Sequence, residues 1–248
     1  MGYIKTKGVI LKGVNAGEAD KIVTVLTKNH GKITVYAKSS RRPRSKLIAG
    51  TQLFCYSDMV LFKGKDMYSI NSCDVIEPFY TIRNDVVKLT YAAHMSDILI
   101  DTIQEEQPSG KALQLFLNSL YMLANTEKSP ALISHIFELR LLKILGYAPR
   151  VSSCVHCGSE DISNMEFDFM QCGLVCSDCA RKGEGSLYIR PGTVRTLQHI
   201  LYSNINDLFK FDVSEEVIHD LDRILRIYLR DRLEKDYNKT DFLKTLNI

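Results

Sequence analysis

Short runs of β-branched and aromatic residues fill the first third of the chain, separated by clusters of Gly, Asn and Asp. Apolar and polar positions alternate within these runs, which is typical of half-buried strands. The pattern predicts five strands, at residues 3–13, 20–28, 31–37, 51–57 and 67–77, with a tight turn at Asn29, His30 and Gly31. Five strands in so short a segment favour a barrel, either an OB-fold, which often binds oligonucleotides, or an SH3-like barrel.

The apolar spacing becomes helical after Glu77 and Pro78. It predicts helices over 86–103, 111–124, 131–145, 191–202 and 214–237. Gly146 is placed to end the third, Pro191 suits a first turn, and Ser214 is a candidate N-cap. We therefore expect an α+β chain with a five-stranded barrel domain at 1–79 and an all-helical domain at 80–248, interrupted by a loop-rich module at 150–185.

Two CxxC pairs with eighteen residues between them form the most specific motif, at Cys154, Cys157, Cys176 and Cys179. Their spacing is that of a four-thiolate zinc site. Four thiolates leave no coordination position open for water, so we expect one structural Zn²⁺ per chain. The alternatives are unmetallated thiols or a redox pair. Cys172 and His156 rank below the four CxxC thiols as ligands.

The distribution of charge along the chain adds information about its ligand. The net charge is only +3, but residues 1–50 carry eleven Lys and Arg against Glu18 and Asp20, a sum of +9. This half of the chain is suited to a polyanion. The chain has 45% hydrophobic residues, enough for a core, and neither a signal peptide nor an apolar run of membrane-spanning length, so we expect a cytoplasmic protein with no membrane partner.

The densest positive charge lies between the third and fourth predicted strands, at Lys38, Arg41, Arg42, Arg44 and Lys46, with no acidic residue among them. We interpret this segment as a flexible arm that contacts phosphates, the alternative being a solvated run of charge. Alternation in the preceding strand places Lys32, Thr34, Tyr36 and Lys38 on one face. Tyr36 could then stack a base while lysines hold the backbone, or it could simply cover the barrel rim.

Motifs of catalysis are missing. The sequence has no GxxxxGK[ST] loop, no GxSxG elbow and no HExxH helix, so we expect a protein without enzymatic activity. Two other classes compete with a DNA-binding protein. One is an RNA-binding or transcription-associated adaptor with a zinc ribbon, and the other is a metal-dependent nuclease or deaminase, which would need an open metal position and a nearby general base.

Three segments resemble known sequence signatures. The first is Glu18–Thr24, followed by Leu26, Thr27, Gly31 and Lys32, and the second is Lys38 with Arg41, Arg42 and Pro43. The third runs from Phe137–Leu142 through Gly146–Pro149 to Cys154. Together, in this order and spacing, they resemble the RecO family of bacterial recombination mediators. The chain departs from that family at Ser39, where glycine is common, and at Cys172 with Gly173, where paired glycine is frequent.

The resemblance implies an amino-terminal OB-fold, a helical domain and, as in many members, a zinc module. It also implies binding of single- and double-stranded DNA and annealing of complementary strands. The expected partners are RecR and, indirectly, RecA, which such proteins help to load onto DNA coated by the single-stranded-DNA-binding protein SSB. We expect the helical domain to bind the acidic, hydrophobic carboxyl-terminal tail of SSB. Arg140 and Lys143 are candidate contacts, unless they are simply exposed or packed against an acid.

Overall fold

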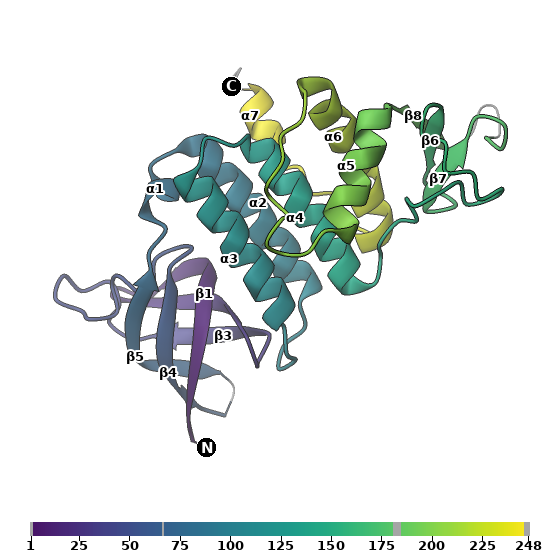
Figure 1. Cartoon of the computed structure of the whole chain (residues 1–248). Coiled ribbons are helices and arrows are strands. Elements are labelled where there is room, and N and C mark those ends of the chain that lie inside the picture. The colour runs from purple at the N-terminus through teal and green to yellow at the C-terminus, as the bar shows by residue number, and fades with distance from the viewer. Residues whose placement is uncertain (1, 66, 181–184, 246–248) are drawn as a thin grey trace. The chain divides into compact units, whose positions relative to one another are not determined.

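The structure is a computed structural model that describes residues 2–65, 67–180 and 185–245 (Figure 1). The chain divides into two compact units. Unit 1 consists of Met1–Thr126 and Lys239–Ile248, and unit 2 consists of Glu127–Asn238. The predicted domain boundary after residue 79 stays a prediction. Among the described residues, no helix combines the length and the apolar character that crossing a bilayer requires.

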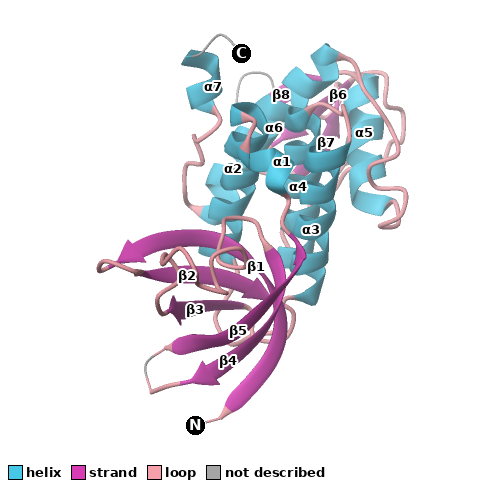
Figure 2. Cartoon of the chain, turned by 90° about the vertical axis from the view of Figure 1, so that its left-hand side faces the viewer, coloured by secondary structure: helices cyan, strands magenta, loops and turns pink. Residues whose placement is uncertain are grey.

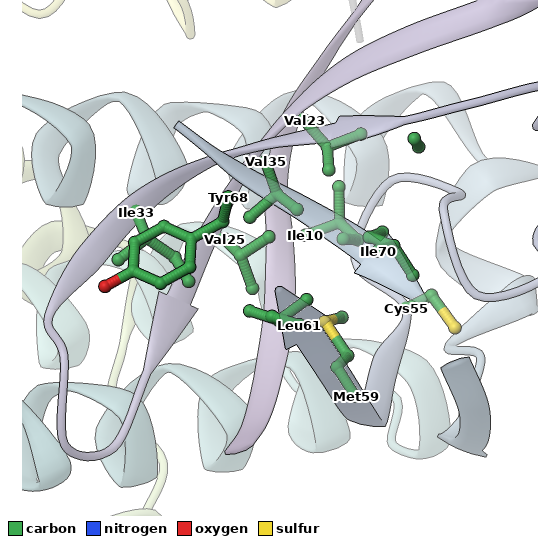
Figure 3. Close-up of a cluster of buried hydrophobic side chains, with 11 residues drawn as sticks. Ile10, Val23, Val25, Ile33, Val35, Cys55, Met59, Leu61, Tyr68 and Ile70 are labelled. Carbon is green, nitrogen blue, oxygen red and sulfur yellow. The ribbon is translucent and has the colours of Figure 1, made fainter. Parts of the chain in front are cut away.

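Unit 1 begins with a closed barrel of five strands: β1 (Tyr3–Ala16), β2 (Asp20–Thr27), β3 (Lys32–Ala37), β4 (Tyr56–Lys63) and β5 (Tyr68–Glu77). Their order around the barrel is β1-β2-β3-β5-β4 (Figure 2). All neighbours are antiparallel except β3 and β5, which are parallel. Alternate residues point inward and form one apolar core, in which Ile10, Val25, Val35 and Leu61 lie close together (Figure 3). The predicted OB-fold barrel followed by helices is confirmed.

The fourth strand was misplaced by the sequence pattern. The pattern predicts it at 51–57, whereas it spans Tyr56–Lys63, where Ser57, Met59 and Leu61 face inward. The apolar residues just before it lie in turns. Phe54 is fully buried with a positive φ of 64°, and its N–H donates to the carbonyl of Ile10 (2.9 Å). The apolar residues of this stretch, which resemble a strand in composition, are therefore apolar because they are buried and not because they pair in a sheet.

Three helices follow the barrel in unit 1: α1 (Tyr80–Arg83), α2 (Val86–Thr102) and α3 (Gly110–Asn125). The short α7 (Asp241–Thr245) also belongs to this unit. The loop from α2 to α3 is attached to the barrel, because Ser109 donates its hydroxyl to the carbonyl of Thr27 (2.7 Å). Gly31 is required there, since its φ is +59° and a Cβ would lie 2.2 Å from the carbonyl oxygen of Gln104.

Unit 2 contains the helices α4 (Pro130–Leu145), α5 (Pro191–Tyr202) and α6 (Glu215–Leu233). Gly146 ends α4 with a φ of 89°, and Pro191 begins α5, both as predicted. Ser214 precedes α6, although its side chain makes no capping hydrogen bond. The same helix ends before the predicted residue 237, because Glu234 adopts a left-handed φ of 54°.

The cysteine module interrupts these helices, but it is not only loop. It carries an antiparallel sheet of three short strands, β6 (Met165–Asp168), β7 (Gly173–Cys176) and β8 (Ser186–Ile189), in the order β7-β6-β8. Strands of four residues are too short for alternation to reveal them.

Candidate metal centre and nucleic-acid interface

The two CxxC pairs fold into matching tight turns. In the first, the N–H of Gly158 donates to the carbonyl of Cys154 (3.0 Å), and Gly158 has a φ of +76°. In the second, which continues from β7, the N–H of Ala180 donates to the carbonyl of Cys176 (2.9 Å). These turns bring all four sulfur atoms within 4.8 Å of one another.

This donor set fits a closed four-sulfur metal site. Metal–sulfur bonds of about 2.3 Å in a tetrahedron place the sulfurs about 3.8 Å apart, and those of Cys157 and Cys176 are 3.6 Å apart. Burial disfavours the Cys154 thiolate, but N–H donors of Cys157, Cys176 and His156 outweigh it and lower the pKa of Cys154 to about 6. A metal ion held by all four sulfurs would have no open position for a reacting water.

Cys172 and His156 lie outside this group of four among the described residues. The thiol of Cys172 is directed to the carbonyl of Phe169 (3.6 Å). Cys172 has a φ of 54° and Ser39 one of 53°, in the left-handed region that glycine adopts without strain. Both positions at which the sequence departs from the glycines of the RecO pattern are therefore positions where the backbone favours glycine.

The basic segment lies on the surface of unit 1 as a series of turns. Lys38, Arg41, Arg42, Arg44 and Lys46 are all exposed. The guanidinium of Arg41 donates to the carbonyls of Gly17 (3.3 Å) and Glu18 (3.1 Å) in the β1–β2 turn. The N–H of Arg42 bonds to the carbonyl of Ser39 (3.1 Å). The segment is thus folded as turns, with Arg41 bound to the β1–β2 turn and the other four cations exposed; its flexibility stays a prediction.

Tyr36 is held in place by an acidic residue of the neighbouring strand, a contact that the sequence pattern does not predict. Its hydroxyl donates to one carboxylate oxygen of Asp20, and the N–H of Ser39 donates to the other (2.6 Å). The hydrogen bond from Tyr36, followed by the one from Ser39, lowers the pKa of Asp20. Asp20 therefore orients both the ring and the start of the basic segment.

Tyr36 belongs to a group of residues on the outer face of the barrel, here called the platform. It consists of two rows of residues that pair across β1, β2 and β3. Val14 of β1 pairs with Ile22 of β2, which pairs with Tyr36 of β3. A second row, Lys12, Thr24 and Thr34, lies beside the first. Val14 is 48% exposed although it is apolar, and Ile22 and Tyr36 are half-buried, so this row offers an apolar surface next to the basic segment. Only the register reveals these rows, because it depends on pairing across strands.

Lys32 shares this outer face but is engaged elsewhere. Its ammonium donates to the carbonyl of Ile100 near the end of α2 (2.6 Å). A cation at that position also interacts favourably with the helix dipole. Lys32 therefore helps to join α2 to the barrel, whereas Lys38 at the other end of β3 is exposed.

Arg140 and Lys143 are similarly occupied within unit 2. The guanidinium of Arg140 donates to the carbonyls of Ile200 (2.7 Å), Leu201 (2.9 Å) and Ser203 (2.7 Å). Lys143 donates to Leu201 as well. These bonds satisfy carbonyls at the end of α5 that lack helical partners. Burial lowers the pKa of Arg140 and, with the charge of Arg140, that of Lys143.

A cavity of about 370 Å³ lies beside α5, lined by Gly192, Arg195, Thr196, His199, Phe211, Asp212, Val213, Ser214 and Val217. The His199 ring packs against Phe211 with their centroids 4.6 Å apart. The side chain of Arg195 is exposed and has no hydrogen-bond or ion-pair partner among the described residues. The cavity thus combines an apolar floor with a cation at its rim.

Comparison with known proteins gives consistent matches along the chain. Family models for the Recombination protein O N terminal and the Recombination protein O C terminal match residues 1–79 and 83–241. A DNA repair protein RecO of Acetivibrio thermocellus is 55% identical over 247 residues, covering 100% of this chain and 98% of that relative. Those of Caldicellulosiruptor saccharolyticus and Alkaliphilus metalliredigens are 35% and 32% identical over 244 residues, each covering 98% of this chain and 99% of the relative.

Proposed function

The chain belongs to the RecO family of DNA repair proteins, and from this membership we propose that it is a recombination mediator. It binds single- and double-stranded DNA and anneals complementary strands. With RecR, it helps to load RecA onto DNA coated by SSB. It acts in the cytoplasm, on the nucleoid, and by binding rather than by enzymatic catalysis.

The outer face of the barrel is the observation that carries this proposal. Its apolar row of Val14, Ile22 and Tyr36 leads to a segment with exposed cations. Apolar and aromatic side chains accept the faces of unpaired bases, while lysines and arginines neutralise the backbone. Such a surface supports binding to single strands with little dependence on sequence. Exposed phosphate contacts also support binding to a duplex.

We assign Zn²⁺ to the four cysteines as a structural ion, one per chain. Four thiolates prefer zinc over the oxygen-seeking cations, and metal binding contributes directly to the folding of small modules of this kind. A closed site also argues against a zinc-dependent nuclease or deaminase, since both need an open position for water.

For the carboxyl-terminal tail of SSB, the cavity beside α5 is a better candidate site than Arg140 and Lys143. The two cations already bond to carbonyls of α5. The cavity offers Phe211 and Val217 to an apolar side chain and Arg195 to a carboxylate. This combination matches an acidic, hydrophobic peptide.

Matched DNA and RNA oligonucleotides, followed by strand annealing without ATP or divalent metal, test the proposed function. We expect tighter binding to DNA and faster annealing than without protein. Tyr36→Ala should lower single-strand affinity by about fivefold or more and leave its salt dependence unchanged, because stacking involves few counterions. Equal or tighter binding to RNA without annealing would instead favour the RNA-binding adaptor.

A further inference from the structure

A second cavity, of about 170 Å³, lies within unit 1 at the beginning of β3. It is lined by Lys32, Ile33, Thr34, Lys63, Gly64, Lys65, Met67, Tyr68, Glu105 and Glu106. Lys32 and Thr34 alternate with the inward residues of β3 and so share the outer face with Tyr36. The cavity therefore lies at the end of the platform opposite to the basic segment.

Most of the charges around the cavity are already paired within the protein. Glu106 accepts hydrogen bonds from the Lys63 ammonium (3.2 Å) and the Tyr68 hydroxyl (2.5 Å). The hydroxyl of Tyr68 points away from the apolar cluster that its ring closes (Figure 3). His30 lies 3.9 Å from Glu106, and Lys32 bonds to Ile100. The hydrogen-bonding groups of these residues are therefore largely occupied within the protein and offer little to a ligand.

Glu105 differs from its neighbour. Within the described part of the chain its carboxylate has no hydrogen bond or ion pair, although it lines the cavity. Its backbone is nonetheless anchored, because Glu105 bridges to Gly31 and Lys32, and the N–H of Lys32 donates to the carbonyl of Gln104 (3.3 Å). Glu105 is exposed, so its carboxylate is open to a ligand at the cavity, while its backbone position is fixed.

We propose that this cavity receives one unpaired base of a bound single strand and that Glu105 makes it prefer guanine. This inference rests on the proposed binding of DNA across the platform. A carboxylate repels phosphate but accepts hydrogen bonds from the donor edge of a base. Guanine presents two parallel N–H donors, N1–H and N2–H, to both carboxylate oxygens, whereas adenine, cytosine and thymine each present a single donor group on that edge.

The dimensions of the site agree with one base. Pockets for drug-sized ligands begin at about 300 Å³, so 170 Å³ suits a single ring system and not a base pair. Along β3, Tyr36 and Thr34 are about 6.6 Å apart, and Thr34 lines the cavity. A strand stacked on Tyr36 can therefore place a base in the cavity a short way along its backbone. Bases in single strands are free to offer this edge.

The test measures binding of the full-length protein to oligo-dT carrying one central dG, dI or dT. Inosine keeps the ring and N1–H of guanine but lacks the N2 amino group. We expect dG to bind about fivefold more tightly than dT, at the low end of the effect of a bidentate base contact, and dI to lose most of this gain. In Glu105→Gln the preference for dG over dI should disappear.

Glu160→Gln, which removes an exposed carboxylate of unit 2, is the control for charge and should keep the preference. Loss of one negative charge strengthens binding to every oligonucleotide alike, so the ratio of dG to dI affinity is the deciding quantity. Equal affinity for dG and dI in the unchanged protein, or a preference that survives in Glu105→Gln, would overturn this inference alone. Failure to bind any of the oligonucleotides would overturn it together with the proposed function.

Discussion

The hydroxyl of Tyr36 donates a hydrogen bond to the carboxylate of Asp20, so the ring assigned to base stacking is oriented by the first residue of β2. The second carboxylate oxygen of Asp20 holds the N–H of Ser39. Asp20 therefore fixes both the stacking ring and the start of the basic segment. It does so although it is an acidic residue on a surface that should attract a polyanion. Its negative charge opposes DNA binding, while the order that it imposes favours it.

Asp20→Asn separates these two effects. Removing a negative charge should strengthen DNA binding, but exchanging the charged acceptor of Tyr36 and Ser39 for a neutral amide should loosen both contacts and so weaken binding. We expect the second effect to dominate, so single-strand affinity should fall several-fold in a titration at fixed salt. Glu18→Gln removes the same charge from an exposed side chain in the adjoining turn and should leave affinity equal or slightly higher. Tighter binding by Asp20→Asn would show that Asp20 acts only through its charge.

The same contact predicts a dependence on pH. The pKa of Asp20 is lowered from 3.8, first by Tyr36 and then by Ser39, so its contribution to stability is fully present well above pH 3.8. That contribution is lost as the pH falls through the lowered pKa of the folded state. The difference in unfolding free energy between the unchanged protein and Asp20→Asn should therefore be largest near neutral pH and shrink in acid. Denaturant titrations at several pH values measure it, and a difference that grew in acid would contradict the assigned contacts.

The exposed cations of the basic segment should govern the salt dependence of binding. Lys38, Arg42, Arg44 and Lys46 are changed together to Gln, and Arg41 is kept because it bonds to the β1–β2 turn. Each phosphate contact contributes about −0.7 to the slope of log affinity against log salt, so the slope should flatten by up to about 2.8. Four exposed cations of unit 2, Lys210, Arg223, Arg230 and Lys235, changed to Gln provide the matched control. An unchanged slope in the first variant, with folding intact, would mean that DNA follows another surface.

Metal content should depend on the four CxxC thiols and not on Cys172. Cys154→Ser and Cys176→Ser should lose zinc in elemental analysis and expose the amides of residues 150–180 to hydrogen exchange. Cys172→Ser should keep one zinc per chain, since its thiol lies outside the group of four. Zinc loss in Cys172→Ser with retention in Cys176→Ser would reverse the ligand assignment.

Substitution of Arg140 should lower the stability of unit 2, whereas substitution of Arg195 should lower its affinity for a peptide. Arg140→Ala removes the donor of the Ile200 and Ser203 carbonyls at the α5 end, whereas Leu201 keeps its bond from Lys143, so it should destabilise unit 2 by about 1–3 kcal/mol. Arg195→Ala should leave thermal unfolding unchanged but weaken binding of an SSB tail peptide, measured by calorimetry at low salt. Unchanged peptide affinity in Arg195→Ala would remove the cavity from consideration, and absence of binding in the unchanged protein would remove the partner.

Ser39 offers a test of backbone strain. A non-glycine residue in the left-handed region costs about 1–2 kcal/mol, part of which the greater freedom of unfolded glycine offsets. Ser39→Gly should therefore raise stability by up to about 1 kcal/mol, because the N–H that binds Asp20 is kept. The neighbouring Ser40, which is buried and lacks a positive φ, is the control, and Ser40→Gly should destabilise. A lower melting temperature for Ser39→Gly would show that the turn is not strained.

Local patterns predicted the features that depend on a few neighbouring residues. The CxxC spacing located the four sulfurs, and Gly146 and Pro191 located helix ends, because each acts through backbone geometry within one turn. Pairing across distant segments could not be predicted this way. The contact of Tyr36 with Asp20 requires β2 and β3 in register, and the role of Lys32 requires α2 beside the barrel. The clustering of positive charge predicted a basic surface on unit 1. For individual residues, charge did not separate the proposed DNA contacts and peptide contacts from structural bonds to helix carbonyls, such as those of Lys32 and Arg140.

The return of the chain to unit 1 sets an order for its folding during synthesis. Lys239 pairs with Asp97 of α2 (2.5 Å), and Leu243 of α7 is 4% exposed, although both residues follow the whole of unit 2 in the sequence. Domains generally fold as they leave the ribosome, amino-terminal ones first. Here the barrel and α1–α3 emerge early, but this part of the surface of α2 stays uncovered until every residue of unit 2 has been translated. The first unit to begin folding is therefore the last to be completed.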